Sequence, residues 1–149
     1  MMSLLEDIDH CFKKALRNQD HLQLSTLRLL KTALKNRQVQ ERRPLTPAEV
    51  VAVITSQVKQ RRDSAAEYQR VGRNDLAQRE EEELRFLLSF LPQQLSGEAL
   101  QKELARIVAE IQAVGPQDLG RVMKTAMAQL AGRVDGRQVQ ALAKELLAG

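Results

Sequence analysis

Apolar residues recur every three or four positions along most of the chain, which is the period of an α-helix with one buried face. The line Leu27, Leu30 and Leu34 is the clearest example, because it places three leucines on one side of a helix. β-branched residues cluster only at 50–55, and the helical spacing continues through that run. The pattern therefore predicts an all-α protein without strands.

Capping residues and prolines divide this pattern into seven predicted helices. The strongest start signal is Thr46, Pro47 and Glu49, where a Thr N-cap, a Pro in the first turn and a Glu three residues on predict a capping box. Ser3 and Glu6 predict a similar box at the first helix. The predicted helices cover residues 3–17, 20–42, 46–71, 74–91, 96–113, 116–131 and 135–148.

A break at Pro92 predicts two domains, because a helix does not easily pass a residue without a backbone N–H and Ser96 can cap a new helix. We expect residues 1–92 to form an antiparallel domain of about four helices with a basic face. Residues 93–149 are expected to form a small three-helix tail domain. Within the tail, Gly132 is expected to end a helix in the left-handed conformation.

The composition indicates which residues fill the core and in which cellular compartment the protein is expected. The chain has 149 residues, of which 43% are hydrophobic and only 3% aromatic, so aliphatic side chains must fill the core. The single cysteine, Cys11, excludes an internal disulfide, which is typical of a reducing compartment. No apolar run is long enough for a bilayer, and the N-terminus lacks an export signal. We expect a cytoplasmic protein without membrane contact.

The sequence contains no motif that we interpret as catalytic or cofactor-binding. The two histidines, His10 and His21, lack the spacing of a metal site, and the seven glycines form no phosphate loop. We expect no catalytic residue, no metal and no cofactor. Glutamates 80–83 are interpreted as the solvated start of a helix, with Glu81 and Arg85 spaced for an ion pair, rather than as a catalytic or cation-binding acid patch.

The net charge of +4 is unevenly distributed along the chain. Residues 28–73 contain eleven Lys and Arg against four acids, whereas residues 74–83 have a charge of −4. Cations at helical spacing can neutralise phosphates, so this segment is a candidate RNA-binding surface. Its candidate residues are Arg28, Lys31, Lys35, Lys59, Arg62, Arg70 and Arg73. The alternative is a solvated charged surface, since few aromatics are available for base stacking.

Four segments carry a resemblance to a known family, namely 57–64, 84–96, 118–123 and 132–136. Their order and spacing resemble the GatB/YqeY family, in its stand-alone YqeY-like form, over nearly the whole chain. The resemblance implies a helical N-terminal domain followed by a helical tail. It relates this tail to the C-terminal domain of the GatB component of the aspartyl/glutamyl-tRNA amidotransferase, where the tail helps to hold tRNA while catalysis occurs elsewhere.

The tail positions that match the family have mostly structural interpretations. These positions are Asp118, Gly120, Val122, Met123, Gly132, Asp135 and Gly136. We expect Gly120 to permit close helix approach, Met123 and Met127 to lie in the core, and Asp135 to cap a helix. The cations beside the matching positions are further candidate RNA contacts, and they are Arg121, Lys124, Arg133 and Arg137.

The leading hypothesis is a non-catalytic tRNA-binding or tRNA-amidotransferase-associated accessory protein. Its candidate partners are tRNA and components of tRNA amidotransferases or aminoacyl-tRNA synthetases. One alternative is participation in glutamine-dependent tRNA amidation, a carbon–nitrogen ligase activity with glutamine as amido-N-donor, although the sequence shows no nucleophile for it. The other alternative is a helical protein-interaction module. The sequence does not determine an oligomeric state.

Overall fold

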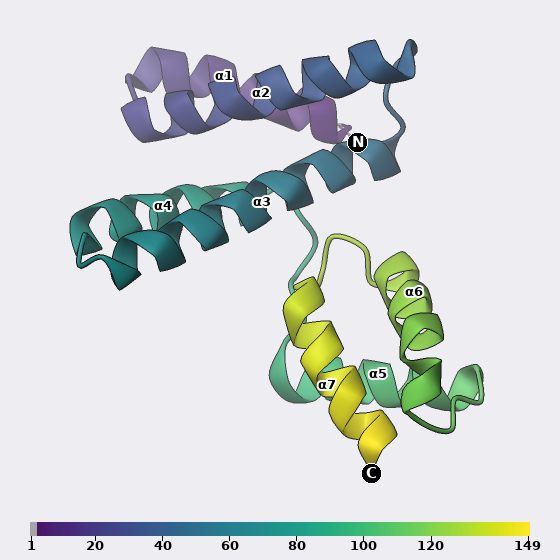
Figure 1. Cartoon of the computed structure of the whole chain (residues 1–149). Coiled ribbons are helices and arrows are strands. Elements are labelled where there is room, and N and C mark those ends of the chain that lie inside the picture. Colours follow the sequence, from purple (N-terminus) through teal and green to yellow (C-terminus); the bar gives the residue numbers. More distant parts are fainter. Residues whose placement is uncertain (1–2) are drawn as a thin grey trace. The chain divides into compact units, whose positions relative to one another are not determined.

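A computed structural model describes residues 3–149, and every regular element in that range is helical (Figure 1). The described chain contains seven α-helices, one short 3-10 helix and no strand, so the predicted all-α class is confirmed. The elements are α1 Leu4–Asn18, α2 His21–Glu41, α3 Pro47–Arg70, α4 Asn74–Leu88, α5 Gly97–Glu110, η1 Pro116–Asp118, α6 Leu119–Gln129 and α7 Gly136–Ala148.

The described chain divides into two compact units, one ending at Pro92 and the other beginning at Gln93. The first unit contains α1–α4 and the second contains α5–α7 with η1. That each unit is an independent domain stays a prediction.

The core of the first unit lies between two helical hairpins, α1–α2 and α3–α4 (Figure 1). The predicted leucine line of α2 is buried, with Leu27 and Leu30 fully enclosed and Leu34 only 6% exposed. From α3, Ile54 is fully buried against the same core. Each such aliphatic side chain contributes about 2 kcal/mol of hydrophobic stabilisation. The α2 face opposite this core is therefore the face presented to solvent.

Helix starts in the first unit follow their sequence signals. The predicted capping box of α3 is confirmed, because Thr46 Oγ1 accepts from Glu49 N at 3.2 Å and Thr46 N donates to Glu49 Oε1 at 2.8 Å. At α1, Ser3 Oγ accepts a hydrogen bond from Glu6 N at 3.2 Å, which is one half of the box expected there.

Some predicted helix ends are wrong. Helix α4 ends at Leu88 rather than at residue 91, because the chain tightens into three-residue hydrogen bonds before Pro92, whose ring disfavours a helical residue preceding it. Helix α5 ends at Glu110 rather than at 113, since Gln112 turns to a left-handed φ of 55°. Residues 116–118 form η1 instead of the first turn of α6.

The second unit packs α5, α6 and α7 around buried Leu100, Leu104 and Ile107. Gly132 has a φ of 77°, which confirms the predicted left-handed residue after α6. Asp135 caps α7 as predicted, with its Oδ1 accepting from Arg137 N at 3.0 Å.

Three expectations for the second unit are wrong. A Cβ on Gly120 would meet nothing within 4 Å, so this glycine does not permit a close helix approach. Met127 is 36% exposed rather than part of the core, whereas Met123 packs against the core as expected. Ser96 precedes α5 without accepting a capping hydrogen bond through its side chain.

Candidate nucleic-acid interface

One flank of α2, about 100° around the helix from the buried leucine line, carries a row of cations. Arg28, Lys31 and Lys35 lie at positions i, i+3 and i+7, and Arg42 at the C-cap follows Lys35 by seven residues. At about 100° per residue these four positions fall within about 60° of one another, over about 21 Å of helix. We call them the α2 row. Arg42 was not among the sequence candidates, although the seven-residue step from Lys35 could have identified it.

The members of the α2 row differ in their contacts. Lys31 Nζ lies 3.0 Å from Asp9 Oδ1 and 4.4 Å from the centre of the Phe12 ring, so its charge is partly compensated by α1. Arg28, Lys35 and Arg42 are exposed, and within residues 3–149 their side chains make no hydrogen bond or ion pair. Three positive charges of the row are therefore uncompensated.

The candidates on and just after α3 have acidic neighbours. Arg70 Nη1 lies 2.9 Å from Glu67 Oε1, and Arg73 Nε lies 3.4 Å from Asp75 Oδ1. The hydrogen bond from Arg73 is the main reason that the pKa of Asp75 is lowered. Lys59 is the exception, being exposed without a polar partner in the described part of the chain. Arg70 and Arg73 are thus largely neutralised by their acidic neighbours.

Two of the four tail candidates, Arg121 and Arg133, help to hold their own unit together. Arg121 donates to Asp118 Oδ1 at 3.0 Å and to the carbonyl of Ile111 at 2.8 Å. Arg133 Nε donates to the carbonyl of Gln93 at 3.3 Å. The main cause of the lowered pKa of Asp118 is a backbone hydrogen bond from Val114 N. These arginines join chain segments within the second unit.

The remaining candidates are Arg62, Lys124 and Arg137. Arg62 and Arg137 each have an interaction within the chain, whereas Lys124 is exposed and has no polar partner across residues 3–149. Among the sequence candidates, the structure thus gathers exposed and uncompensated cations only on α2, with Lys59 and Lys124 standing apart. RNA contact by any of these residues stays a prediction.

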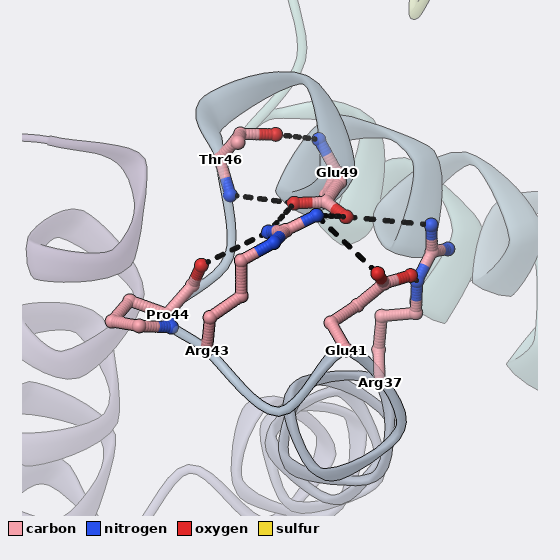
Figure 2. A network of polar contacts seen from close by, with 6 residues as sticks. All are labelled: Arg37, Glu41, Arg43, Pro44, Thr46 and Glu49. Carbon is pink, nitrogen blue, oxygen red and sulfur yellow. Dashed lines mark hydrogen bonds and ion pairs between the residues drawn. The ribbon is translucent and has the colours of Figure 1, made fainter.

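The α2 row ends at a polar network that joins α2 to α3 (Figure 2). Arg43 donates to both carboxylate oxygens of Glu49, at 2.7 and 3.0 Å, and Arg37 Nε donates to Glu41 Oε1 at 2.9 Å. Hydrogen bonds from Arg43 and then Thr46 lower the pKa of Glu49 to about 2. Glu49 is therefore ionised at neutral pH and binds Arg43. We call this the corner network.

A second network connects α3 and α4. Arg61 lies with Nη1 3.3 Å from Glu80 Oε2 and Nε 3.3 Å from Glu83 Oε2, and Arg79 Nε is 3.5 Å from Glu83 Oε1. Glu83 is only 6% exposed, and burial raises its pKa despite the attraction of Arg61. We call this the hairpin network.

The hairpin network corrects the interpretation of glutamates 80–83 as a solvated face. Glu80 and Glu83 point into an ion-pair cluster with Arg61, a residue that was not among the sequence candidates. The expected pair of Glu81 and Arg85 is absent from the described structure, where Gln69 Nε2 instead donates to Glu81 at 3.0 Å.

Within residues 3–149 there is no group of three or more His, Cys, Asp and Glu side chains placed to hold a metal ion. None of the helices in this range is long and apolar enough to cross a membrane.

Comparison with known proteins identifies relatives of the chain. The model of the family described as "Yqey-like protein" matches residues 5–147. A curated relative from Clavispora lusitaniae is named "Altered inheritance of mitochondria protein 41, mitochondrial", and it is 29% identical over 113 residues. This match covers 74% of the chain and 66% of the relative, slightly less than two thirds of its length. The relative is named as mitochondrial, and a cytoplasmic location of this chain stays a prediction. Because the family match spans almost all of the sequence, the chain belongs to the YqeY-like protein family.

Proposed function

We propose that this protein is a non-catalytic RNA-binding accessory protein that contacts phosphates through the α2 row, with tRNA as its RNA. The observation that carries the proposal is the set of three exposed cations, Arg28, Lys35 and Arg42, that lack an intramolecular partner within residues 3–149. Such cations can bind phosphates and release condensed counterions without first breaking an internal ion pair.

The choice of tRNA rests on the resemblance of the tail to the C-terminal domain of an amidotransferase component that helps to hold tRNA. The same resemblance supports an accessory role beside a tRNA amidotransferase or an aminoacyl-tRNA synthetase. In that role the partner enzyme supplies the amide chemistry, and this chain supplies positive surface for the tRNA backbone. Phosphate contacts of this type position a nucleic acid and carry no base specificity.

The experiment is a fluorescence anisotropy titration of labelled tRNA at several salt concentrations. The test variant is Arg28→Glu/Lys35→Glu, and the matched control is Lys102→Glu/Lys144→Glu, which makes the same change in net charge at exposed residues of α5 and α7. We expect wild-type affinity to fall steeply as salt rises. The α2 variant should bind at least about tenfold more weakly, while the control should stay within about twofold to threefold of wild type.

Two outcomes contradict the proposal. One is a wild-type affinity for tRNA that is undetectable or independent of salt. The other is an equal loss of affinity in the α2 variant and in the control, because this would show that only the total charge matters. Copurification with a protein but no nucleic acid would favour the interaction-module alternative instead.

A further inference from the structure

A cleft of about 460 Å³ lies at the corner where α2 ends and the chain turns into α3. Its lining residues are Lys35, Gln38, Val39, Arg42, Arg43 and Pro44. The first four belong to the last two turns of α2 or to its C-terminal cap, and Arg43 and Pro44 come from the connection. The volume is in the range of clefts that take small ligands.

The charge inside the cleft comes from two residues. Arg43 is already bound to Glu49, Glu41 and the carbonyl of Pro44 in the corner network (Figure 2). Lys35 and Arg42 have no such partner within the described chain, so they supply the positive charge available to a ligand. Seven residues separate them, which is about 10 Å along the helix.

The cleft also has an apolar wall. Val39 lies between Lys35 and Arg42 along the chain and is 67% exposed, although α2 already has a complete line of buried leucines. Pro44 adds a second apolar surface to the lining. The amide of Gln38 can both donate and accept hydrogen bonds. A ligand that matches this lining carries anionic groups, a flat or apolar part and polar edges.

The corner network gives the cleft a fixed shape. Arg43 holds the carboxylate of Glu49 with two hydrogen bonds, and Thr46 N donates to the same group, so the start of α3 is tied to the end of α2 (Figure 2). Arg42 occupies the left-handed region with a φ of 58°, which turns the chain away from the helix axis. A cleft held in this way loses less conformational entropy when a ligand binds.

We propose that this cleft binds one unpaired nucleotide of a single-stranded RNA segment. Lys35 and Arg42 neutralise the phosphates on either side of the nucleotide, its base or ribose packs on Val39 and Pro44, and Gln38 bonds a polar edge. The proposal rests on the proposed RNA-binding function and deepens it, because it names the single-stranded part of the RNA as the part that is bound. Proteins commonly bind exposed bases of single strands in this way.

The first experiment is an NMR titration of the methyl- and amide-labelled full chain with uridine monophosphate, with inorganic phosphate and with a short single-stranded RNA. We expect the nucleotide and the RNA to shift the Val39 methyl signals and the amide signals of residues 35–44. Phosphate alone should shift the amide signals. It should shift the Val39 methyl signals by less than half as much as uridine monophosphate does. Absence of any shift in this segment with the RNA overturns the proposal.

The second experiment compares binding of a single-stranded RNA and a duplex RNA of equal length to matched variants. Val39→Ser tests the apolar wall, and Val71→Ser is its control, because Val71 at the end of α3 is 68% exposed and lies outside the cleft. Arg42→Gln removes the charge with little added backbone strain, since Gln19 and Gln112 adopt the same left-handed backbone in this chain.

We expect the wild-type chain to bind the single-stranded RNA more tightly than the duplex. Val39→Ser and Arg42→Gln should each weaken single-strand binding by about threefold to tenfold, so that the two affinities become more similar. Val71→Ser should stay within twofold of wild type. Equal affinity for single-stranded and duplex RNA, or equal effects of the two valine variants, overturns the proposal.

The two proposals fail in distinguishable ways. If tRNA binds through Arg28 and Lys35 while the Val39 methyls stay unshifted, the nucleotide site is wrong and the RNA-binding function stands. If tRNA does not bind but the short single-stranded RNA shifts the Val39 methyls, the choice of tRNA is wrong and the nucleotide site stands.

Discussion

The corner network and the hairpin network each combine two arginines with two glutamates, but their carboxylates have opposite pKa shifts. At the corner, hydrogen bonds from Arg43 and Thr46 stabilise the ionised form of Glu49 and lower its pKa to about 2. In the hairpin, Glu83 is 6% exposed, and the cost of desolvating its charge raises its pKa although Arg61 and Arg79 lie beside it. The two networks have the same number of charged groups, so the surroundings of each glutamate decide whether its pKa is raised or lowered.

Neither network has positive charge to offer to a ligand. In both networks the arginines are bound by carboxylates, and on α3 Arg70 and Arg73 also have acidic neighbours. The segment from 28 to 73 is strongly basic in sequence, yet most of its arginines are compensated in the fold. Within residues 28–73 of the described chain, the exposed cations that make no hydrogen bond or ion pair are Arg28, Lys35 and Arg42 of the α2 row and Lys59 of α3.

The largest expected effect on stability comes from breaking the hairpin network. Glu83→Ala leaves the 13%-exposed side chain of Arg61 with Glu80 as its remaining carboxylate, so we expect the free energy of unfolding to fall by about 2 kcal/mol. Urea denaturation followed by circular dichroism measures this change. Glu82→Ala is the control, because the neighbouring Glu82 is exposed and should change stability by less than about 0.5 kcal/mol. Equal effects of the two variants would show that Glu83 is not stabilising through Arg61.

A smaller effect is expected from the corner, where the capping hydroxyl can be removed alone. Thr46→Ala deletes the acceptor for Glu49 N and should lower the free energy of unfolding by about 1 kcal/mol. Thr32→Ala is the matched control, since Thr32 is exposed inside α2 and alanine is a better helix former. Denaturation that shows no loss for Thr46→Ala, or the same loss for both, contradicts the role of the capping box.

The effects of pH differ in sign between the two glutamates. Folded Glu83 keeps its proton above the ordinary glutamate pKa, so stability falls as pH rises through the window between that ordinary pKa and the raised one. Folded Glu49 loses its proton earlier, so its contribution is present above the ordinary pKa and is lost as pH falls towards about 2.

Unfolding free energies of Glu83→Gln and Glu49→Gln across the acid range separate these contributions. Glu83→Gln should remove the fall in stability that occurs as pH rises above the ordinary glutamate pKa. Glu49→Gln should remove the fall in stability that occurs as pH drops below it. Parallel pH profiles for wild type and both variants would contradict the opposite shifts.

Much of the fold was predictable because its signals are local. The leucine line of α2 and the capping box at Thr46 each depend on residues within a few positions, and both were confirmed. The family was also correctly identified from short motifs spread over the chain. The helix ends were predicted less well, because the turn before Pro92 and the left-handed Gln112 depend on the connections that follow.

The candidate interface was less predictable because the compensation of charge is tertiary. Arg61 and Glu83 are separated by 22 positions in sequence, so helical spacing along α4 alone could not show that this glutamate is buried. Local pairing also failed at Glu81, which receives a hydrogen bond from Gln69 of α3. Arg42 was not among the candidates, although the predicted helix extended to residue 42 and the seven-residue step from Lys35 continues the row.

The central claim is that the positive charge available to RNA lies on α2 rather than on α3. The most direct test is the dependence of tRNA affinity on salt for Arg28→Gln/Lys35→Gln and for Lys59→Gln/Arg70→Gln. We predict that the slope of log K against log salt becomes shallower by about 1.5 in the α2 variant and by less than about half of that in the α3 variant. An equal or larger change in the α3 variant would contradict the claim.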